Sequence, residues 1–331
     1  MPKINRPRFG SLQFYPRKRV AKFLPAANWI NVENSDAIKS LKEHGLLGFI
    51  VYKVGMSSAL IKDNTEHVLT KGKKITIPVT ILEAPNMKAY SIRFYKNKRP
   101  VNEIVVSNEK ELKKILRVTK QVKDSKAVDS EIKNYDYDDV SIIAYSIVKE
   151  TSIKKSPDII EIGIKGESKE KKLEYAKSLI GKEITLKDFL NNYTLLDFRG
   201  LTKGKGLSGP VARFGIGLKG HKSEKGVRRP GSLGPWHPSR VTFKAPQAGQ
   251  LGMFTRIHYN QKVIGFGEIK EKDINPSEGF KHYGKINTNY LIVNGSVQGP
   301  QKRQILITPA FRPTKDQSKK KYEFIQLMNK Q

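Results

Sequence analysis

Apolar residues of this chain fall into short, β-branched runs that are separated by glycines and polar turns. Runs of this length and composition, bounded by turn residues, are typical of β-strands. The Asn294-Gly295 pair is a turn signal among the later runs. The pattern predicts strands of a small barrel or a strongly twisted sheet at Leu46–Val54, Ser58–Ile61, Ile75–Leu82, Val263–Gly267, Lys281–Ile286, Tyr290–Val293 and Ile305–Ile307.

Three further segments have the capping residues and apolar positions of short helices. Ser35 or Asp36 can cap the first, and Gly45 ends it. Asn108 and Glu111 have the spacing of a capping box at the start of the second. The third combines several apolar positions with a glycine just beyond its end. The predicted helices cover residues 36–44, 108–116 and 168–180.

Residues 101–188 differ from the rest of the chain in charge. They contain 18 Lys/Arg and 17 Asp/Glu, more than half of the chain's 31 acidic residues. Strand-like runs at Val140–Val148 and Ile159–Ile164 lie between the second and third predicted helices. Because strand patterns precede and follow this balanced unit, we interpret it as an α/β insertion in the barrel domain.

The predicted fold class is therefore mainly β with an α+β insertion, a basic N-terminal arm and a central loop extension. The predicted parts are the arm over 1–34, a first barrel part over 35–86, the insertion over 87–188, a second barrel part over 189–214, the basic loop extension over 215–257, a third barrel part over 258–310 and a C-terminal surface tail over 311–331.

The stretch from Arg199 to Lys262 has no lasting apolar period and is rich in glycine. It carries 13 Lys/Arg against one acid, Glu224. Such a segment buries too little apolar area to offset the entropy of ordering its backbone. Aromatic residues lie among its cations, which is unusual for a linker and suits contact with phosphates and bases. We interpret the stretch as a nucleic-acid probe that becomes ordered on its partner.

Residues 1–25 carry seven Lys/Arg and no acid. Prolines spaced along them prevent a regular helix, and the charges prevent burial in an apolar core. Four aromatic residues argue against an inert solvated tail: Phe9, Phe14, Tyr15 and Phe23. We expect an extended arm that threads along nucleic acid.

The whole 331-residue chain has a formal net charge of +31 and a pI near 10.0. With 37% hydrophobic residues the chain can build a core. Its positive charges repel one another, so we expect a polyanionic partner that neutralises them. No stretch of 18 apolar residues occurs, so we expect no membrane partner. Cysteine is absent, and no pair of the six histidines has zinc-ligand spacing. The N-terminus lacks the apolar region of a signal peptide, so we expect a cytoplasmic protein.

Two stretches fit the G-x-G-x-x-G pattern, Gly204–Gly209 and Gly215–Gly220. A dinucleotide site also needs a preceding strand, a following helix and an acid about 20 residues later. Neither copy is followed by a helical pattern, Pro210 follows the first copy directly, and the acid is missing. We therefore expect the glycines to allow close approach of the backbone to RNA. The basic stretch offers almost no carboxylate for acid–base chemistry. We expect no enzyme, no cofactor and no small-molecule substrate; an RNA-modifying enzyme or a general RNA- or DNA-binding protein remains the alternative.

Four motifs resemble one protein family. They are LNNYTLLDFRGLTKGKGLSG at Leu190–Gly209, PRFGSLQFYPRKR at Pro7–Arg19, GSLGPWHPSRV at Gly231–Val241, and HYGKI with NYLIVNGSVQGPQKR within His282–Arg303. In sequence and in their order along the chain, these motifs are similar to the archaeal and eukaryotic branch of the large-subunit ribosomal protein L-three family. The resemblance covers nearly the whole chain, including the insertion.

The resemblance implies a six-stranded β-barrel body and binding to large-subunit ribosomal RNA (rRNA), with neighbouring ribosomal proteins as further partners. It implies that the arm and the central loop reach toward the peptidyl transferase centre, with Trp236 at the loop tip. In eukaryotic members a loop histidine is methylated. The aligned position here is Glu224, and the nearest histidine is His221, so we do not transfer that modification.

The candidate rRNA-binding residues lie in the arm, in the central stretch and in the Gly/Pro turn near residue 300. They are Arg6, Arg8, Arg17, Lys18, Arg19, Arg199, Lys203, Lys205, Arg213, Lys219, His221, Lys222, Lys225, Arg228, Arg229, Trp236, His237, Arg240, Lys244, Arg256, Lys302 and Arg303.

Overall fold

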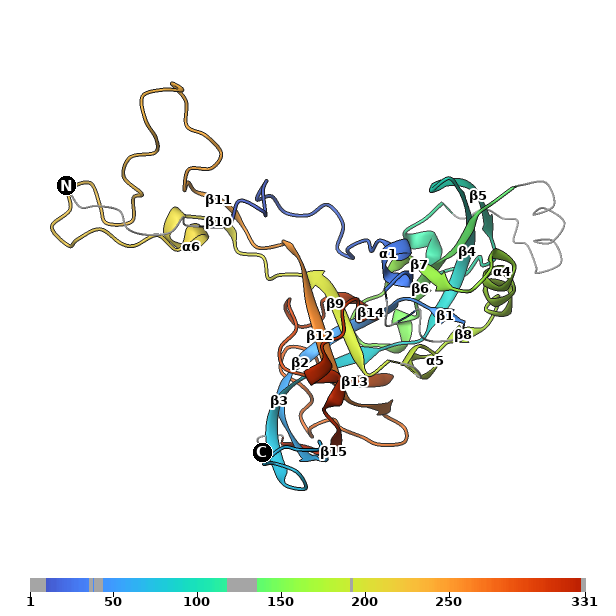
Figure 1. The fold of residues 1–331 in the computed structure, drawn as a ribbon. Helices are drawn as coiled ribbons and strands as arrows, with labels where there is room; N and C mark the ends of the chain where they lie inside the picture. Colours follow the sequence, from blue (N-terminus) through green and yellow to red (C-terminus); the bar gives the residue numbers. More distant parts are fainter. Residues whose placement is uncertain (1–9, 36–37, 39–43, 118–135, 191–192, 329–331) are drawn as a thin grey trace. The chain divides into compact units, whose positions relative to one another are not determined.

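The computed structural model describes residues 10–35, 38, 44–117, 136–190 and 193–328 (Figure 1). The chain divides into two compact units. One, which we call the arm–loop unit, comprises Met1–Phe23 and Leu201–Arg256. The other, the body, comprises Leu24–Gly200 and Ile257–Gln331. Residues 24–34, which we assigned to the arm from the sequence, are thus grouped with the body.

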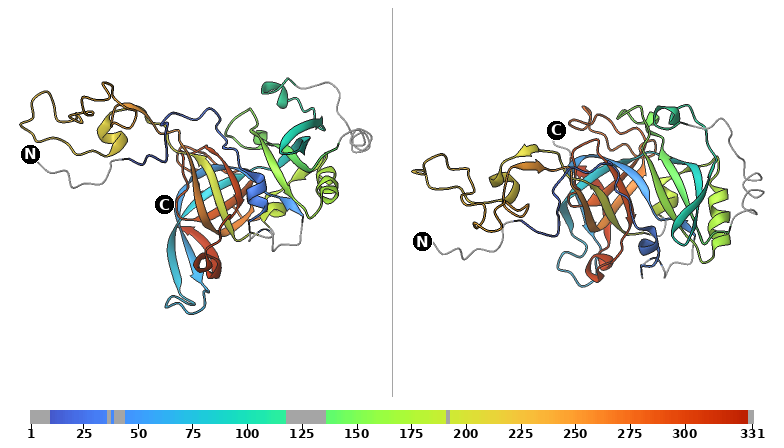
Figure 2. Two further views of the ribbon diagram at one scale, coloured as in Figure 1. Left: turned by 45° about the horizontal axis from the view of Figure 1, so that its top comes forward. Right: turned by 90° about the horizontal axis from the view of Figure 1, so that it is seen from above.

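The larger sheet of the body is strongly curled (Figure 2). Its strand order is β14-β9-β12-β13-β3-β2-β15, and β14 also pairs with β2. The central basic stretch connects the end of β9 to the start of β12. The strands are β2 (Phe49–Asp63), β3 (Lys74–Ala84), β9 (Leu195–Leu201), β12 (Thr255–Glu268), β13 (Asn289–Asn294), β14 (Gln304–Pro309) and β15 (Tyr322–Met328).

Strands β9, β13 and β14 of this sheet are buried on both faces, which explains why they read as continuous apolar runs. In β13, Leu291 and Val293 join one apolar cluster, while Tyr290 and Ile292 between them join another. Most of the predicted strands are therefore confirmed. Two predicted runs form the single strand β2, because the register shift between Lys53 and Gly55 bends the strand without ending it.

The insertion forms a second, antiparallel sheet in the order β1-β7-β6-β4-β5, with β8 paired to β4. Ser168 caps its main helix by accepting a hydrogen bond from the Lys171 amide, as its position before the helix predicts. The segment predicted to be an α+β insertion thus contains both strands and a helix. Its elements are β4 (Met87–Lys96), β5 (Arg99–Val105), β6 (Asp139–Ser146), β7 (Ile159–Lys165), α4 (Lys169–Ser178) and β8 (Glu183–Ile184); β1 (Gly45–Leu46), α1 (Trp29–Glu33) and α5 (Leu186–Leu190) adjoin them.

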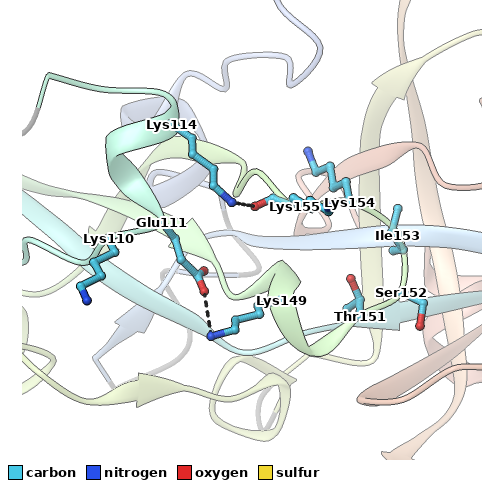
Figure 3. Close-up of a pocket in the computed structure, with 9 residues that line it drawn as sticks. All are labelled: Lys110, Glu111, Lys114, Lys149, Thr151, Ser152, Ile153, Lys154 and Lys155. Carbon is cyan, nitrogen blue, oxygen red and sulfur yellow. Dashed lines mark hydrogen bonds and ion pairs between the residues drawn. The ribbon is translucent and has the colours of Figure 1, made fainter.

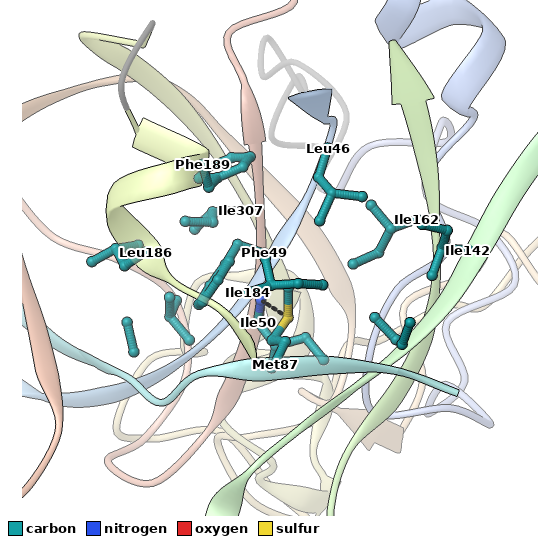
Figure 4. Packing of buried hydrophobic residues seen from close by; sticks show 14 of the residues in the cluster. Leu46, Phe49, Ile50, Met87, Ile142, Ile162, Ile184, Leu186, Phe189 and Ile307 are labelled. Atoms are coloured by element: carbon teal, nitrogen blue, oxygen red, sulfur yellow. Dashed lines mark hydrogen bonds between the residues drawn. The ribbon is translucent and has the colours of Figure 1, made fainter. Parts of the chain in front are cut away.

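The main apolar core is shared by the two sheets (Figure 4). Phe49 of β2 is fully buried, and its ring centroid lies 6.0 Å from that of Phe189 on α5. Met87 of β4 contacts the same strand, since its sulfur accepts a hydrogen bond from the Ile50 amide at 3.4 Å. The insertion and the curled sheet therefore share one core.

Two sequence expectations differ from the structure, and a third is not tested by it. The helix predicted over 108–116 is only a 3₁₀ turn, η1 (Leu112–Lys114), and no side chain caps it. The strand predicted over Lys281–Ile286 is wrong, because Gly279, His282 and Gly284 have positive φ and turn the backbone there. The helix predicted over 36–44 lies mostly outside the described residues.

Part of the predicted C-terminal surface tail instead forms a strand of the curled sheet. After the short helix α7 (Lys315–Lys319), the chain forms β15 against β2, with Tyr322 opposite Asp63 and Met328 opposite Ser58. Phe324 packs against the second apolar cluster. The edge of β2 supplies the backbone partners that this short apolar stretch lacks by itself.

Gly163 of β7 is required by the tryptophan that opens α1. An added Cβ at Gly163 would lie 2.6 Å from the Cβ of Trp29 and 2.9 Å from its Cγ. We expect Gly163→Ala to lower the free energy of unfolding by about 1–3 kcal/mol through overpacking. Gly45→Ala in the paired strand β1 is the matched control, since no atom lies within 4 Å of its added Cβ. Chemical denaturation of both variants checks this, and equal losses would contradict it.

Candidate RNA-binding surface

The base of the central stretch is an antiparallel ladder. β10 (Gly206–Ser208) pairs with β11 (Gly249–Leu251), and the Thr202 amide donates to the Phe254 carbonyl at 3.0 Å. Gly252 makes this approach possible: it has φ +77°, and an added Cβ would lie 1.9 Å from the Lys203 carbonyl oxygen. The expectation that the stretch has no packing of its own is therefore wrong at its base. Between helix α6 (Pro210–Phe214) and β11 it forms no helix or strand.

Two arginines fasten the arm to this base by exchanging hydrogen bonds with each other's backbone. Arg17 Nη1 donates to the Arg213 carbonyl at 2.8 Å, and Arg213 Nη2 donates to the Arg17 carbonyl at 3.2 Å. Farther along the arm, the Val20 amide donates to the Met253 carbonyl at 3.1 Å. The arm therefore has a fixed path within the arm–loop unit from Gly10 to Phe23.

The Arg213 guanidinium also binds the returning side of the loop. Its Nε donates to the Gln250 carbonyl at 3.0 Å, and Nη1 donates to the Gln247 carbonyl at 3.1 Å. Burial and the neighbouring Arg17 charge lower the pKa of Arg213 from its usual value. We expected both arginines to bind RNA, but the structure gives them a structural role that the sequence does not reveal.

Arginines and aromatic rings alternate along the arm and the loop base. The Arg17 guanidinium lies 4.2 Å from the Phe214 ring centroid, and Arg256 lies 4.5 Å from that of Phe14. Tyr15 and Phe243 meet edge to face with centroids 5.4 Å apart. These contacts hold the rings in place, although Phe243 remains 69% exposed.

Tyr15 and Phe243 form two walls of a hollow of about 500 Å³, which we call the aromatic slot. The Tyr15 hydroxyl is buried and has no hydrogen-bond partner among the described residues. The slot is lined by Tyr15, Pro16, Arg17, Arg213, Phe243, Ala245, Gln247 and Ala248. Stacking walls, cationic groups and an unused hydroxyl suit a planar polar ligand such as a nucleobase.

Within the loop, Trp236 has a side chain that is 86% exposed. A turn carries it, closed by a hydrogen bond of 2.8 Å from the Ser239 amide to the Trp236 carbonyl. Trp236 borders a shallow hollow of about 440 Å³ together with Leu233 and Arg240. The residue is therefore held on a turn without being buried.

Most of the other candidate residues of the arm and loop are exposed, as binding to RNA requires. They are Lys18, Arg19, Lys203, Lys205, Lys219, His221, Lys222, Lys225, Arg228, Arg229, His237, Arg240 and Lys244. Arg256 is partly buried by its aromatic contacts. Arg6 and Arg8 lie outside the described residues.

The three candidate residues of the body differ in environment. Arg199 is partly buried and donates to the Thr308 hydroxyl at 3.3 Å, and burial lowers the pKa of its guanidinium. Burial also lowers the pKa of Arg303. Lys302 is exposed on the same turn. Arg199 thus forms a hydrogen bond between two strands of the sheet, whereas Lys302 is exposed to solvent.

Sequence reasoning missed Lys53, which holds that turn. Lys53 is buried on β2, and its ammonium donates to the Val297 carbonyl and, at 3.2 Å, to the Gly299 carbonyl. Its backbone exchanges hydrogen bonds with Lys302 and Arg303. A single cation inside the apolar run Leu46–Val54 is the signal that could have indicated this anchor.

Comparison with known proteins identifies the family. A family described as "Ribosomal protein L3" matches residues 1–330. The chain belongs to the ribosomal protein L3 family. It is similar to the protein named large ribosomal subunit protein uL3 of Methanocaldococcus jannaschii, with 38% identity over 94% of this chain and 92% of that protein. The protein of the same name from Methanococcus vannielii is 37% identical over 95% of this chain and 94% of its own.

Family membership confirms the resemblance found in the four motifs, including its archaeal character. In the part of the chain that the structure describes, no helix is long and apolar enough to cross a membrane. The same part contains no group of three or more His, Asp or Glu residues placed to hold a metal ion. The site of this L3 family member is thus a surface of exposed cations and aromatic rings on a hydrogen-bonded frame.

Proposed function

We propose that this L3 family member is a structural constituent of the large ribosomal subunit, where it binds large-subunit rRNA and supports its folding and assembly. The observation that carries the proposal is the arm–loop unit, where exposed Lys and Arg surround exposed rings. Neighbouring large-subunit proteins are its further partners. No cluster in the described residues favours the alternative of an RNA-modifying enzyme.

The cations supply affinity that does not depend on sequence. Each Lys or Arg that neutralises a phosphate releases condensed counterions, so binding weakens as salt rises. In the loop from 215 to 248, Glu224 is the only acid, so little internal ion pairing opposes this. The arm and the loop therefore act together as one phosphate-binding surface.

The aromatic groups add contacts to bases. A base stacked on an aromatic side chain contributes ~1–3 kcal/mol. The aromatic slot offers such a place for an unpaired base, and Trp236 offers another at the loop tip. The rings of the slot are already positioned by Arg17 and by their edge-to-face contact, which reduces the entropy lost on binding.

The body is proposed to act as a six-stranded barrel that carries this surface. Support comes from β14, which pairs with β9 along one edge and with β2 along the other. With β12, β13 and β3 between them, these pairings join six strands in a ring. A closed ring has no free strand edges, so its ends are firm points of attachment for the central stretch.

The loop is proposed to extend toward the peptidyl transferase centre, with Trp236 at its tip. RNA crosslinking with sequencing on subunits that carry this protein tests the proposal. We expect crosslinks from Trp236 near that centre and crosslinks from the arm elsewhere in the same RNA. Crosslinks spread over unrelated RNAs would overturn the ribosomal role, and crosslinks confined to the body would overturn the placement of the loop.

We expect Trp236→Ala to leave the yield of large subunits unchanged and to alter tRNA accommodation by about tenfold. The side chain is exposed on its turn, so its loss removes a stacking contact worth ~1–3 kcal/mol without disturbing a core. Accommodation kinetics on purified ribosomes measure the effect. Val241→Ala, at another exposed apolar residue of the loop, is the control. Failure of Trp236→Ala subunits to assemble would make Trp236 a structural residue.

A further inference from the structure

A second concentration of positive charge lies in the insertion, in the body. A hollow of about 530 Å³ is formed by the segment around η1, by the 3₁₀ turn η2 (Val148–Glu150) and by the loop that follows it (Figure 3). We call it the lysine basin. Its lining residues are Lys110, Glu111, Lys114, Lys149, Thr151, Ser152, Ile153, Lys154 and Lys155.

Within the part of the chain that the structure describes, most of the ammonium groups of the basin have no close carboxylate. Lys110 and Lys155 have no carboxylate partner among the described residues, and Lys114 donates only to the Lys155 carbonyl, at 3.4 Å. Lys149 lies 3.8 Å from Glu111, but its side chain is 82% exposed, so water screens that pair. Among the described carboxylates, a close partner is found for only one of the five lysines, Lys154, which pairs with Asp158.

This concentration is notable because the insertion as a whole is nearly neutral. Four of its acids form ion pairs with cations outside the basin: Glu103 and Glu161 both bind Arg93, at 2.7 and 2.9 Å. Glu109 and Glu183 both bind Lys88, at 3.0 and 3.5 Å. Positive charge is therefore unevenly distributed in the insertion, because five lysines and only one glutamate line the basin.

The basin has a rigid frame. Leu112 of η1 is fully buried in a cluster with Tyr90, Ile143 and Tyr145. On the other side, the Thr151 hydroxyl donates to the Val148 carbonyl at 2.8 Å, and Ser152 accepts from the Asn287 side chain at 3.0 Å. The backbone that carries the lysines is thus fixed before any ligand arrives, and the ligand needs to order only their side chains.

We propose that the lysine basin binds the phosphodiester backbone of large-subunit rRNA, as a surface separate from the arm–loop unit. Its lining suits phosphate better than protein, because lysine is depleted at protein interfaces and enriched at those with nucleic acid. Ile153 is its one apolar lining residue. The inference rests on the proposed rRNA-binding function and adds a second point of attachment, on the insertion.

Charge reversal at two basin lysines tests the proposal in the full chain. We expect the double variant Lys114→Glu/Lys155→Glu to bind purified large-subunit rRNA more weakly, measured by filter binding over a series of salt concentrations. Losing two phosphate contacts should reduce the slope of log K against log salt by about 1.5–2. The control Lys98→Glu/Lys113→Glu changes net charge equally at exposed lysines that do not line the basin. Its slope should stay close to that of the unmodified protein.

A second measurement needs no variant. In assembled subunits, Lys110, Lys114, Lys149 and Lys155 should be protected from acetylation relative to Lys113, as read by mass spectrometry. Unprotected basin lysines, or equal slope losses in the two double variants, would overturn the proposal. So would carbodiimide crosslinks from Lys114 or Lys155 to an acidic residue of a neighbouring protein. In each case crosslinks from Trp236 and the arm would still support the proposed function.

Discussion

Replacing Glu83 with alanine is expected to lower the free energy of unfolding by about 3–5 kcal/mol, the largest effect of any single change considered for this protein, because several buried donors would each lose their acceptor at a cost of about 1–3 kcal/mol. Glu83 lies on β3 and is fully buried. Its carboxylate accepts hydrogen bonds from the amides of Asn287 and Thr288 at 2.9 and 3.2 Å, and from the Thr288 hydroxyl at 3.1 Å. The Tyr283 hydroxyl donates to its other oxygen. Alanine would leave these groups without an acceptor.

The pKa of Tyr283 reports the same environment. Burial raises it well above the usual value, and the neighbouring Glu83 charge raises it further, so the hydroxyl stays a donor. Tyr283 belongs to the HYGKI motif that marks the family resemblance. The hydrogen bond from Tyr283 to Glu83 gives that motif a stabilising role, because it holds the segment after β12 against β3.

Equilibrium unfolding by denaturant measures the effect. Glu83→Gln keeps the size and one acceptor oxygen, so we expect a loss of about 1–2 kcal/mol. Glu278→Ala removes an exposed glutamate and should stay within ~0.5 kcal/mol of the unmodified protein. If Glu83→Ala unfolded like Glu278→Ala, the buried hydrogen bonds would contribute no net stability.

Replacing Arg213 with lysine is expected to release the arm almost as fully as replacing it with alanine. Arg213 donates to carbonyl groups of residues 17, 247 and 250, which lie in the arm and on the returning loop. A planar guanidinium reaches all three at once, whereas an ammonium cannot reproduce this fork. If Arg213 served only as a positive charge that binds RNA, Arg213→Lys would behave like the unmodified protein.

Hydrogen exchange of the peptide spanning residues 10–23 distinguishes these roles. In Arg213→Lys and Arg213→Ala we expect about tenfold faster exchange there, including at the Val20 amide, because lost hydrogen bonds of about 1–2 kcal/mol open the arm more often. Arg228→Lys, at an exposed arginine of the loop, should leave exchange unchanged. If this peptide stayed fully protected from exchange in Arg213→Lys, the arm would not depend on the guanidinium, and binding to RNA would remain the role of Arg213.

Much of the fold could be predicted because each signal is local. Apolar β-branched runs locate strands, Ser168 locates a helix start, and charge balance separates the insertion from the rest. The same local signals failed at η1, where the spacing of Asn108 and Glu111 fits the start of a longer helix but the chain forms only the 3₁₀ turn Leu112–Lys114. They also failed at Lys281–Ile286, where the backbone turns to bring Tyr283 to Glu83. In both places tertiary contacts outweigh local preference.

The candidate site was predicted in part for the same reason. Exposure follows from composition, and the loop cations and Trp236 are exposed, while their binding to rRNA stays a prediction. The role of Arg17 could not be predicted, because its hydrogen bond joins residues 196 positions apart. Lys53 and the lysine basin depend equally on which segments meet. No local pattern distinguishes a cation that donates to a distant carbonyl from one that faces solvent.

The sequence alone determined that this is a mainly β, strongly basic protein with an α+β insertion, a basic arm and a basic loop, and its motifs indicated the family. These properties depend on composition and on the period of apolar residues, which each segment carries by itself. Only the tertiary structure decided that Arg17 and Arg213 join the arm to the loop, that the C-terminal residues add a strand to β2, and that the insertion gathers its unneutralised lysines in one hollow. Such features arise from contacts between distant segments, whose free energy no single segment contains.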